Sequence, residues 1–135
     1  MRILVCGSRY FGYTSGSNYT RKDYSVFNRA IDFVKSYGPT VIIEGNGAGG
    51  DEVGKMTSLA LSIPCKTFSA GLGECSISSG PARNKQMLEV GKPDLVIAFK
   101  REDNTSNMIK QAEKAGVPVV RYFEDRDKSD YLNNG

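Results

Sequence analysis

Short apolar runs alternate along the chain with segments of helical periodicity. The runs are rich in β-branched residues and are bounded by Gly or Pro, a pattern typical of short buried strands. They cover residues 3–6, 40–44, 65–68, 95–99 and 117–122. Each run therefore predicts one strand of a buried sheet.

Four amphipathic segments separate these runs and predict helices. The first covers about residues 22–37, with apolar side chains at steps of three and four. The second starts after Asp51, the third opens at Pro81, and the fourth runs from about Thr105 to Gly116. Strands that alternate with helices in this way predict an α/β fold: a single Rossmann-like open parallel sheet of about five strands with helices on both faces.

Chain length and charge narrow the class of protein. The 135 residues fit one domain, which we expect over residues 1–123, followed by a polar tail, 124–135, that frays or docks on a partner subunit. No apolar run approaches the roughly 20 residues of a membrane span, so no membrane partner is expected. The 18 basic and 15 acidic residues give a net charge of +3, which is too balanced for an obligate nucleic-acid binder.

Two residue types limit the chemistry. The chain has no histidine, which removes the usual general base near neutral pH, His-containing triads and most catalytic zinc sites. Its three cysteines, Cys6, Cys65 and Cys75, lack CxxC spacing, so a disulfide scaffold is not expected and a reducing cytoplasm is the simplest location. We expect no metal site and no cofactor.

The stretch after the second apolar run carries the clearest functional signal. Residues 45–50 include four glycines and lead into a helical segment, and such a turn lets free backbone amides approach a phosphate. The same turn also forms where the backbone needs a positive φ, with Asp51 as a cap of the following helix. The spacing is neither the G-x-G-x-x-G dinucleotide motif nor a P-loop, so both interpretations stay open.

Further candidates follow the other strands. In an open doubly wound sheet, ligands bind beyond the carboxyl ends of the strands, where the strand order reverses. The segments after the first, second and fourth strands and the start of the third helix should therefore meet at one rim. They carry amides, hydroxyl groups and the Arg9 and Arg83 guanidinium groups, which suit phosphate or ribose. Arg83 has two interpretations. It is either an ordinary solvated residue or a ligand contact, since a cation in the first turn of a helix opposes the helix dipole and so suggests an anion nearby.

These motifs together resemble the YspA-like branch of the SLOG superfamily. The resemblance covers roughly residues 2–122, and its most specific parts are the Gly7-Ser8-Arg9 start and the Arg83-Asn84-x-x-Met87 block. It implies a Rossmann-like domain that binds nucleotides or nucleotide-derived ligands. Relatives include the cytokinin-activating phosphoribohydrolases, DNA-processing protein A and sensor domains for signalling nucleotides in bacterial immunity.

The chain departs from the family pattern at three positions. Ala48 stands where an Arg is common, and Asn104 stands where a Gly precedes the threonine, so the phosphate cradle is altered. The phosphoribohydrolases take their catalytic carboxylate from a Gly-Gly-x-Gly-Thr-x-x-Glu block, and the matching position here is Met108, which cannot act as a general acid or base. Arg83 matches the active-site Arg of those enzymes. The resemblance thus implies binding without that chemistry, and no catalytic residue is assigned.

We therefore expect a binding module, a sensor or sequestering protein for a nucleotide or a nucleotide-derived signalling ligand, linear or cyclic. The alternative is a hydrolase of an N-glycosidic or phosphate bond, in which Glu44 or Asp51 replaces the missing carboxylate. A nucleic-acid module is disfavoured by the charge balance. The candidate ligand-binding residues are Gly7, Ser8, Arg9, Gly45, Asn46, Gly47, Gly49, Asp51, Gly80, Arg83, Asn84, Asn104 and Thr105.

Two further expectations concern the first loop and the assembly. The loop at residues 10–21 is either a lid, whose aromatic residues Phe11, Tyr13 and Tyr19 stack on a base, or a plain flexible loop. Sheet edges and apolar helix faces in so small a protein favour a homodimer or a higher homo-oligomer.

Overall fold

A computed structural model describes residues 1–14, 21–69, 80–99 and 103–122. Within these residues the strands are β1 (Arg2–Gly7), β2 (Tyr13–Thr14), β3 (Arg21–Lys22), β4 (Val41–Glu44), β5 (Cys65–Thr67), β6 (Leu95–Phe99) and β7 (Val119–Tyr122). The helices are α1 (Tyr24–Lys35), α2 (Gly50–Leu61), α3 (Gly80–Glu89) and α4 (Asp103–Lys114).

The main sheet of the described residues has five strands in the order β5-β4-β1-β6-β7, and all its pairs are parallel. The chain runs outward from β1 through β4 to β5, and it then crosses to β6 on the other side of β1. The strand order therefore reverses between β1 and β6. This arrangement confirms the predicted α/β class and places the expected crevice at the carboxyl ends of β1 and β6.

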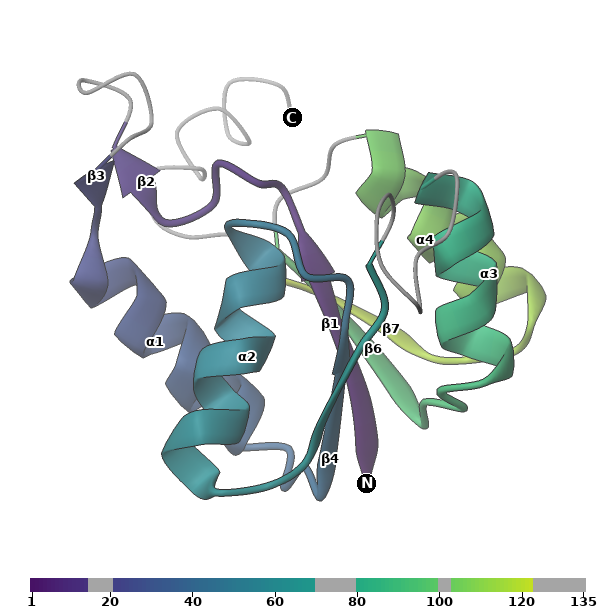
Figure 1. The fold of residues 1–135 in the computed structure, drawn as a ribbon, viewed down its shortest axis with the longest axis horizontal. Helices are drawn as coiled ribbons and strands as arrows, with labels where there is room; N and C mark the ends of the chain where they lie inside the picture. The colour runs from purple at the N-terminus through teal and green to yellow at the C-terminus, as the bar shows by residue number, and fades with distance from the viewer. Residues whose placement is uncertain (15–20, 70–79, 100–102, 123–135) are drawn as a thin grey trace.

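Helices cover both faces of the sheet. Figure 1 shows α1 and α2 together on one side of the strands and α3 and α4 together on the other. Alternate residues of β1 serve the two faces: Ile3 and Val5 pack with α1 and α2, whereas Leu4 and Cys6 pack with α3 and α4. Because successive side chains of a strand point to opposite faces, a strand covered on both sides reads as a continuous apolar run.

Several helix and strand ends differ from the sequence predictions, and one pair of strands was not predicted. The helix predicted after Asp51 begins at Gly50. The segment after β1 contains a short antiparallel pair, β2 and β3, that the apolar pattern did not predict. A two-residue strand is too short for an alternating pattern, so its sequence carries no signal of its own. No helix of the described residues meets the length and hydropathy needed to cross a membrane.

The aromatic residues at the start of the first loop belong to the core. Phe11 is 1% exposed, and its ring lies 5.0 Å from that of Phe99 and 6.5 Å from that of Phe27, measured between centroids. The Tyr13 ring also packs against Phe27, at 6.0 Å. Phe11 therefore anchors the loop and is not free to stack on a base, while Tyr19 lies outside the described residues.

Candidate functional site

The carboxyl end of β1 lies directly against the first turn of α2. A Cβ added to Gly50 would lie 2.4 Å from the Cα of Gly7, and one added to Gly49 would lie 2.0 Å from the Ser8 carbonyl oxygen. Gly49 also has a φ of +68°, a conformation that favours glycine. Both glycines thus allow two backbone segments to approach closely. For this part of the turn, glycine is therefore explained by packing alone, without a ligand.

Backbone amides of the glycine turn already have partners within the chain. The Gly47 N–H donates to Asp51 Oδ2 at 2.9 Å, and the Gly49 N–H donates to Glu52 Oε1 at 3.0 Å. The Gly50 N–H donates to the Ser8 carbonyl at 3.0 Å. Two carboxylates of α2 and the Ser8 carbonyl therefore take up three amides of this turn that a phosphate could otherwise bind.

Arg83 projects from α3 across the turn that follows β4. Its guanidinium group lies against Gly45, where a Cβ would come within 2.9 Å of the Arg83 Cζ. Nη1 donates to the Gly45 carbonyl and Nη2 to Asn84 Oδ1, each at 3.3 Å. Arg83 Nε is buried and has no hydrogen-bond partner in the described part of the chain. The glycine at position 45 is thus what lets the guanidinium approach the end of β4.

The Cys6 thiol reports the electrostatics beneath this rim. Burial raises its pKa, the negative charge of Asp51 raises it further, and the positive charge of Arg83 opposes both. Asp51 and Arg83 therefore act on the end of β1 from opposite faces of the sheet, one from α2 and the other from α3. The thiol itself stays protonated at neutral pH and is not a nucleophile.

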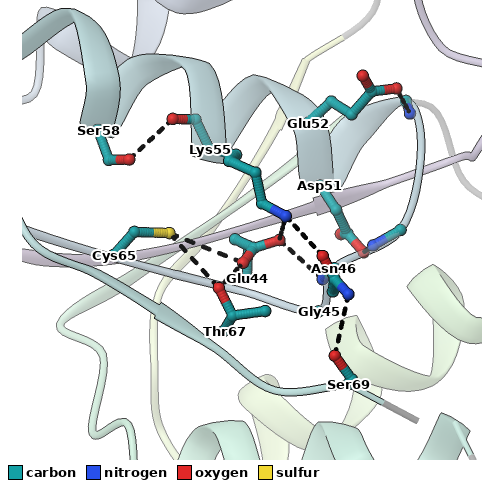
Figure 2. Close-up of polar contacts among 12 residues, drawn as sticks. Glu44, Gly45, Asn46, Asp51, Glu52, Lys55, Ser58, Cys65, Thr67 and Ser69 are labelled. Carbon is teal, nitrogen blue, oxygen red and sulfur yellow. Dashed lines mark hydrogen bonds and ion pairs between the residues drawn. The ribbon is translucent and has the colours of Figure 1, made fainter. Parts of the chain in front are cut away.

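Glu44, at the end of β4, is fully buried and is bound by the chain on both oxygens (Figure 2). Oε1 accepts the Asn46 N–H at 2.7 Å and lies 4.0 Å from Lys55 Nζ. Oε2 accepts the Thr67 hydroxyl and lies 3.7 Å from Cys65 Sγ. These contacts make Glu44 the anchor of the turn after β4 and leave neither of its oxygens unbonded.

A second carboxylate, Glu52, ties the β2–β3 pair to the glycine turn. Besides the Gly49 N–H, it accepts the Tyr13 hydroxyl and forms an ion pair with Lys22 Nζ at 2.8 Å. Burial alone would raise the pKa of Glu52, but the hydrogen bonds from Lys22, Tyr13 and Gly49 lower it overall. Burial and the hydrogen bond to Glu52 raise the pKa of Tyr13 to about 12. Glu52 is therefore ionised and structural near neutral pH.

The structure brings most of the expected rim together. The loop after β1, the turn after β4 and the start of α3 meet through the contacts of Ser8 with Gly49 and of Arg83 with Gly45. Thr105 is buried in the first turn of α4, which follows β6 at the same edge of the sheet. Residue 79, just before α3, and residues 100–102, just after β6, lie outside the described residues, as does the Asn104 side chain.

Two candidate residues face elsewhere or have other partners, and a third opens α3. The Asn46 side chain accepts from Lys55 Nζ of α2 at 2.5 Å and donates to Ser69 Oγ, just after β5, at 3.0 Å (Figure 2). Arg9 is exposed, with its guanidinium carbon 5.0 Å from the Tyr10 ring centroid. Gly80 is the first residue of α3.

Met108, which matches the catalytic Glu of the phosphoribohydrolases, is a core residue. It is 1% exposed and packs beneath α4 in the same cluster as Leu4, Met87 and Ala98. A carboxylate there would be buried among apolar side chains at a high desolvation cost. Met108 therefore serves the packing of the core at this position.

Several contacts were not foreseen from sequence. Glu52 follows Gly49 by three residues, which is the spacing of a capping box, but glycine lacks the side chain that makes this signal recognisable. Asn107 and Gln111 bond to each other four residues apart on α4 and reach α3; their spacing alone indicates only a shared helix face.

In the described residues, no group of three or more Cys, Asp or Glu side chains is placed to hold a metal ion. Comparisons with protein-family models, with curated proteins and with solved structures found no match to this chain. The site must therefore be interpreted from its own chemistry.

Proposed function

We propose that this chain binds a nucleotide or nucleotide-derived ligand at the rim formed by the ends of β1 and β4 and the start of α3, as a sensor or sequestering protein. We also propose that it is a member of the YspA-like branch of the SLOG superfamily. The observation that carries the proposal is the Arg83 guanidinium, whose buried Nε has no hydrogen-bond partner among the described residues.

A buried N–H of a cation without a partner is unusual and calls for an explanation. The two bonds that Arg83 does make are long, at 3.3 Å each, and neither acceptor is charged. A phosphate would supply the missing acceptor and the opposite charge, and a guanidinium binds its oxygens in a bidentate geometry. These features support an anionic group at Arg83.

The position in the fold supports a nucleotide in particular. The rim lies beside the reversal of strand order, where open α/β sheets bind nucleotides. The Gly47 and Gly49 amides are bound to Asp51 and Glu52. The proposal therefore assigns the phosphate to Arg83 and its neighbours rather than to the glycine turn. Ser8 and Thr105 carry buried hydroxyl groups at the same edge and suit ribose or phosphate oxygens.

The same geometry favours binding over hydrolysis. Glu44, one of the two carboxylates that could replace the missing catalytic group, is buried with both oxygens bonded to the chain. Asp51 is 7% exposed and accepts the Gly47 N–H. Both carboxylates are buried and already accept hydrogen bonds from the chain, which disfavours either one as the general base that activates a water.

Calorimetric titration with nucleoside mono-, di- and triphosphates, ADP-ribose and cyclic dinucleotides tests the proposal. At least one should bind, and chromatography should recover it intact. Arg83→Ala should weaken binding by about 1.5–3 kcal/mol, the range of a charge-assisted hydrogen bond. Lys85→Ala is the matched control, because Lys85 lies on the same helix but is 68% exposed and pairs with Glu89.

Two outcomes would reject the proposal. If every member of the panel fails to bind, or if Arg83→Ala and Lys85→Ala have the same effect, the rim is not the site. Sustained release of a free base, lost on Arg83→Ala, would instead establish the hydrolase. We further propose a cytoplasmic homodimer or higher homo-oligomer, on the grounds of the cysteine spacing and of the two edge strands, β5 and β7.

A further inference from the structure

A ladder of side-chain amides connects α3 to α4 beside the rim. Arg83 Nη2 donates to Asn84 Oδ1 at 3.3 Å, and Asn84 Nδ2 donates to Asn107 Oδ1 at 3.2 Å. Gln111 Nε2 donates to the same Asn107 oxygen at 2.7 Å and to the Pro81 carbonyl at 3.0 Å. The ladder therefore begins at Arg83 and returns to the first turn of the helix that carries it.

The donors and acceptors of this ladder allow one orientation of each amide. Asn107 Oδ1 accepts two N–H groups, so turning this amide over would place donors against donors. Asn84 must therefore present its Nδ2 to Asn107 and its Oδ1 to Arg83. Asn84 is 1% exposed, so water cannot easily replace a lost partner and an incorrect orientation would leave buried groups unpaired.

The guanidinium of Arg83 is held between this ladder and the turn after β4. One side is fixed by Asn84 Oδ1, and the other by the Gly45 carbonyl. These are its two acceptors among the described residues, so the direction in which Nε points depends on both. Loss of the Asn84 orientation would leave Arg83 attached at one side only.

We infer that Asn107 and Gln111 are positioning residues that hold Arg83 in its ligand-binding orientation through Asn84. The inference deepens the proposed function and rests on it where ligand affinity is concerned. Neither residue needs to touch the ligand, because both act through the amide of Asn84. The ladder also couples α4 to α3, so the two helices present Thr105 and Arg83 in a fixed relation.

The roles of the two amides differ, and this difference supplies the test. Asn107 acts only as an acceptor in the ladder, so Asn107→Asp keeps both of its bonds. Gln111 acts only as a donor, so Gln111→Glu places an acceptor against two acceptors, and Gln111→Met removes the donor without adding charge. Gln86→Glu is the control, because Gln86 lies exposed on α3 and has no bond in the ladder.

The first readout is independent of any ligand. The Nε–H signal of Arg83, assigned by its loss in Arg83→Lys, reports solvent exchange at the buried Nε in nuclear magnetic resonance spectra of the full chain. We expect Asn107→Asp and Gln86→Glu to keep the wild-type exchange rate. Gln111→Glu and Gln111→Met should exchange at least about fivefold faster, because local opening limits such exchange.

The second readout is affinity for adenosine 5′-monophosphate and inorganic phosphate as probes. Both Gln111 variants should bind about fivefold or more weakly, the scale of one lost hydrogen bond, and Asn107→Asp should stay within about twofold. If neither probe binds the wild type, affinity cannot support the proposed function for phosphate monoesters, but the exchange rates still decide the inference. Equal exchange rates in all four variants, or faster exchange in Asn107→Asp than in Gln111→Met, would overturn it.

Discussion

Gly49 shows how a single residue fixes the start of α2 against the end of β1. Its φ is +68°, and a Cβ there would lie 2.0 Å from the Ser8 carbonyl oxygen and 2.7 Å from the Arg9 carbonyl carbon. Backbone atoms cannot move aside as the tip of a side chain can. Both the conformation and the packing therefore require glycine at this position.

We predict that Gly49→Ala destabilises the fold by about 3 kcal/mol or more, because overpacking adds to backbone strain. Gly38→Ala is the matched control: Gly38 has the same φ of +68°, but apart from its chain neighbours no atom of the described residues lies within 4 Å of an added Cβ. It should cost only about 1–2 kcal/mol, the strain of a left-handed conformation. Chemical denaturation measures both, and equal losses would mean that packing at Gly49 contributes nothing.

The candidate residues could be predicted from sequence only in part. The motif positions were singled out by residue type, and two of the expected approaches are present: Ser8 lies against Gly49, and Arg83 lies against Gly45. The partners of the glycine-turn amides could not be foreseen, since nothing in the sequence distinguishes an amide that waits for a phosphate from one bound to Asp51. The role of Asn107 depends on the orientation of an amide, which residue type does not fix.

At the scale of elements, Glu52 joins three parts of the rim. It lies in the first turn of α2 and binds the Gly49 N–H, Tyr13 of β2 and Lys22 of β3. The β2–β3 pair has only two residues in each strand, so its own ladder is too short to be stable alone. The contact with Glu52 is thus what fixes this pair to α2.

We predict a pH-dependent effect of Glu52→Gln. The pKa of Glu52 is lowered from 4.5 and that of Lys22 is raised from 10.5, so the ionised pair stabilises the fold above the first value and below the second. The pKa of Tyr13 is raised from 10.0 to about 12, so the contribution of its protonated hydroxyl is complete below pH 10 and is lost as the pH rises toward 12. Glu52→Gln should therefore cost about 0.5–1 kcal/mol near pH 7, and this cost should fall as the pH drops below 4.5 and through the lowered pKa of Glu52.

Denaturation at several pH values measures this difference. Glu89→Gln is the control, because Glu89 pairs with Lys85 at 3.9 Å on an exposed face and should have little effect at any pH. A Glu52→Gln cost that does not vary between pH 3 and pH 7 would show that the charge of Glu52 has no part in holding the β2–β3 pair.

Most elements could be predicted because each buried strand is a continuous apolar run. The predicted strand 95–99 matches β6 (Leu95–Phe99), and the helix expected at about 22–37 is α1 (Tyr24–Lys35). Ends differ by a residue or more because caps depend on contacts distant in sequence, such as that of Gly50 with Gly7. The β2–β3 pair depends on Glu52 and the core, so local sequence could not predict it.

At the scale of the whole molecule, the sheet of the described residues has two edge strands, β5 and β7. An unpaired edge exposes backbone groups that a second sheet can bind, and we predict that the chain is at least a dimer. Light scattering at tens of micromolar should return at least twice the chain mass of 14.7 kDa. A mass near 14.7 kDa at that concentration would contradict this expectation.

The most direct test of the proposed function is a map of where a nucleotide binds. Titration of the isotope-labelled protein with the tightest-binding nucleotide of the panel should shift the amide signals of Ser8 and Gly45 and the Nε–H signal of Arg83. The loops at the opposite edge of the sheet, represented by Gly38, Lys92 and Gly116, should not change. Saturable shifts confined to that opposite edge, or no shifts at all, would contradict the account.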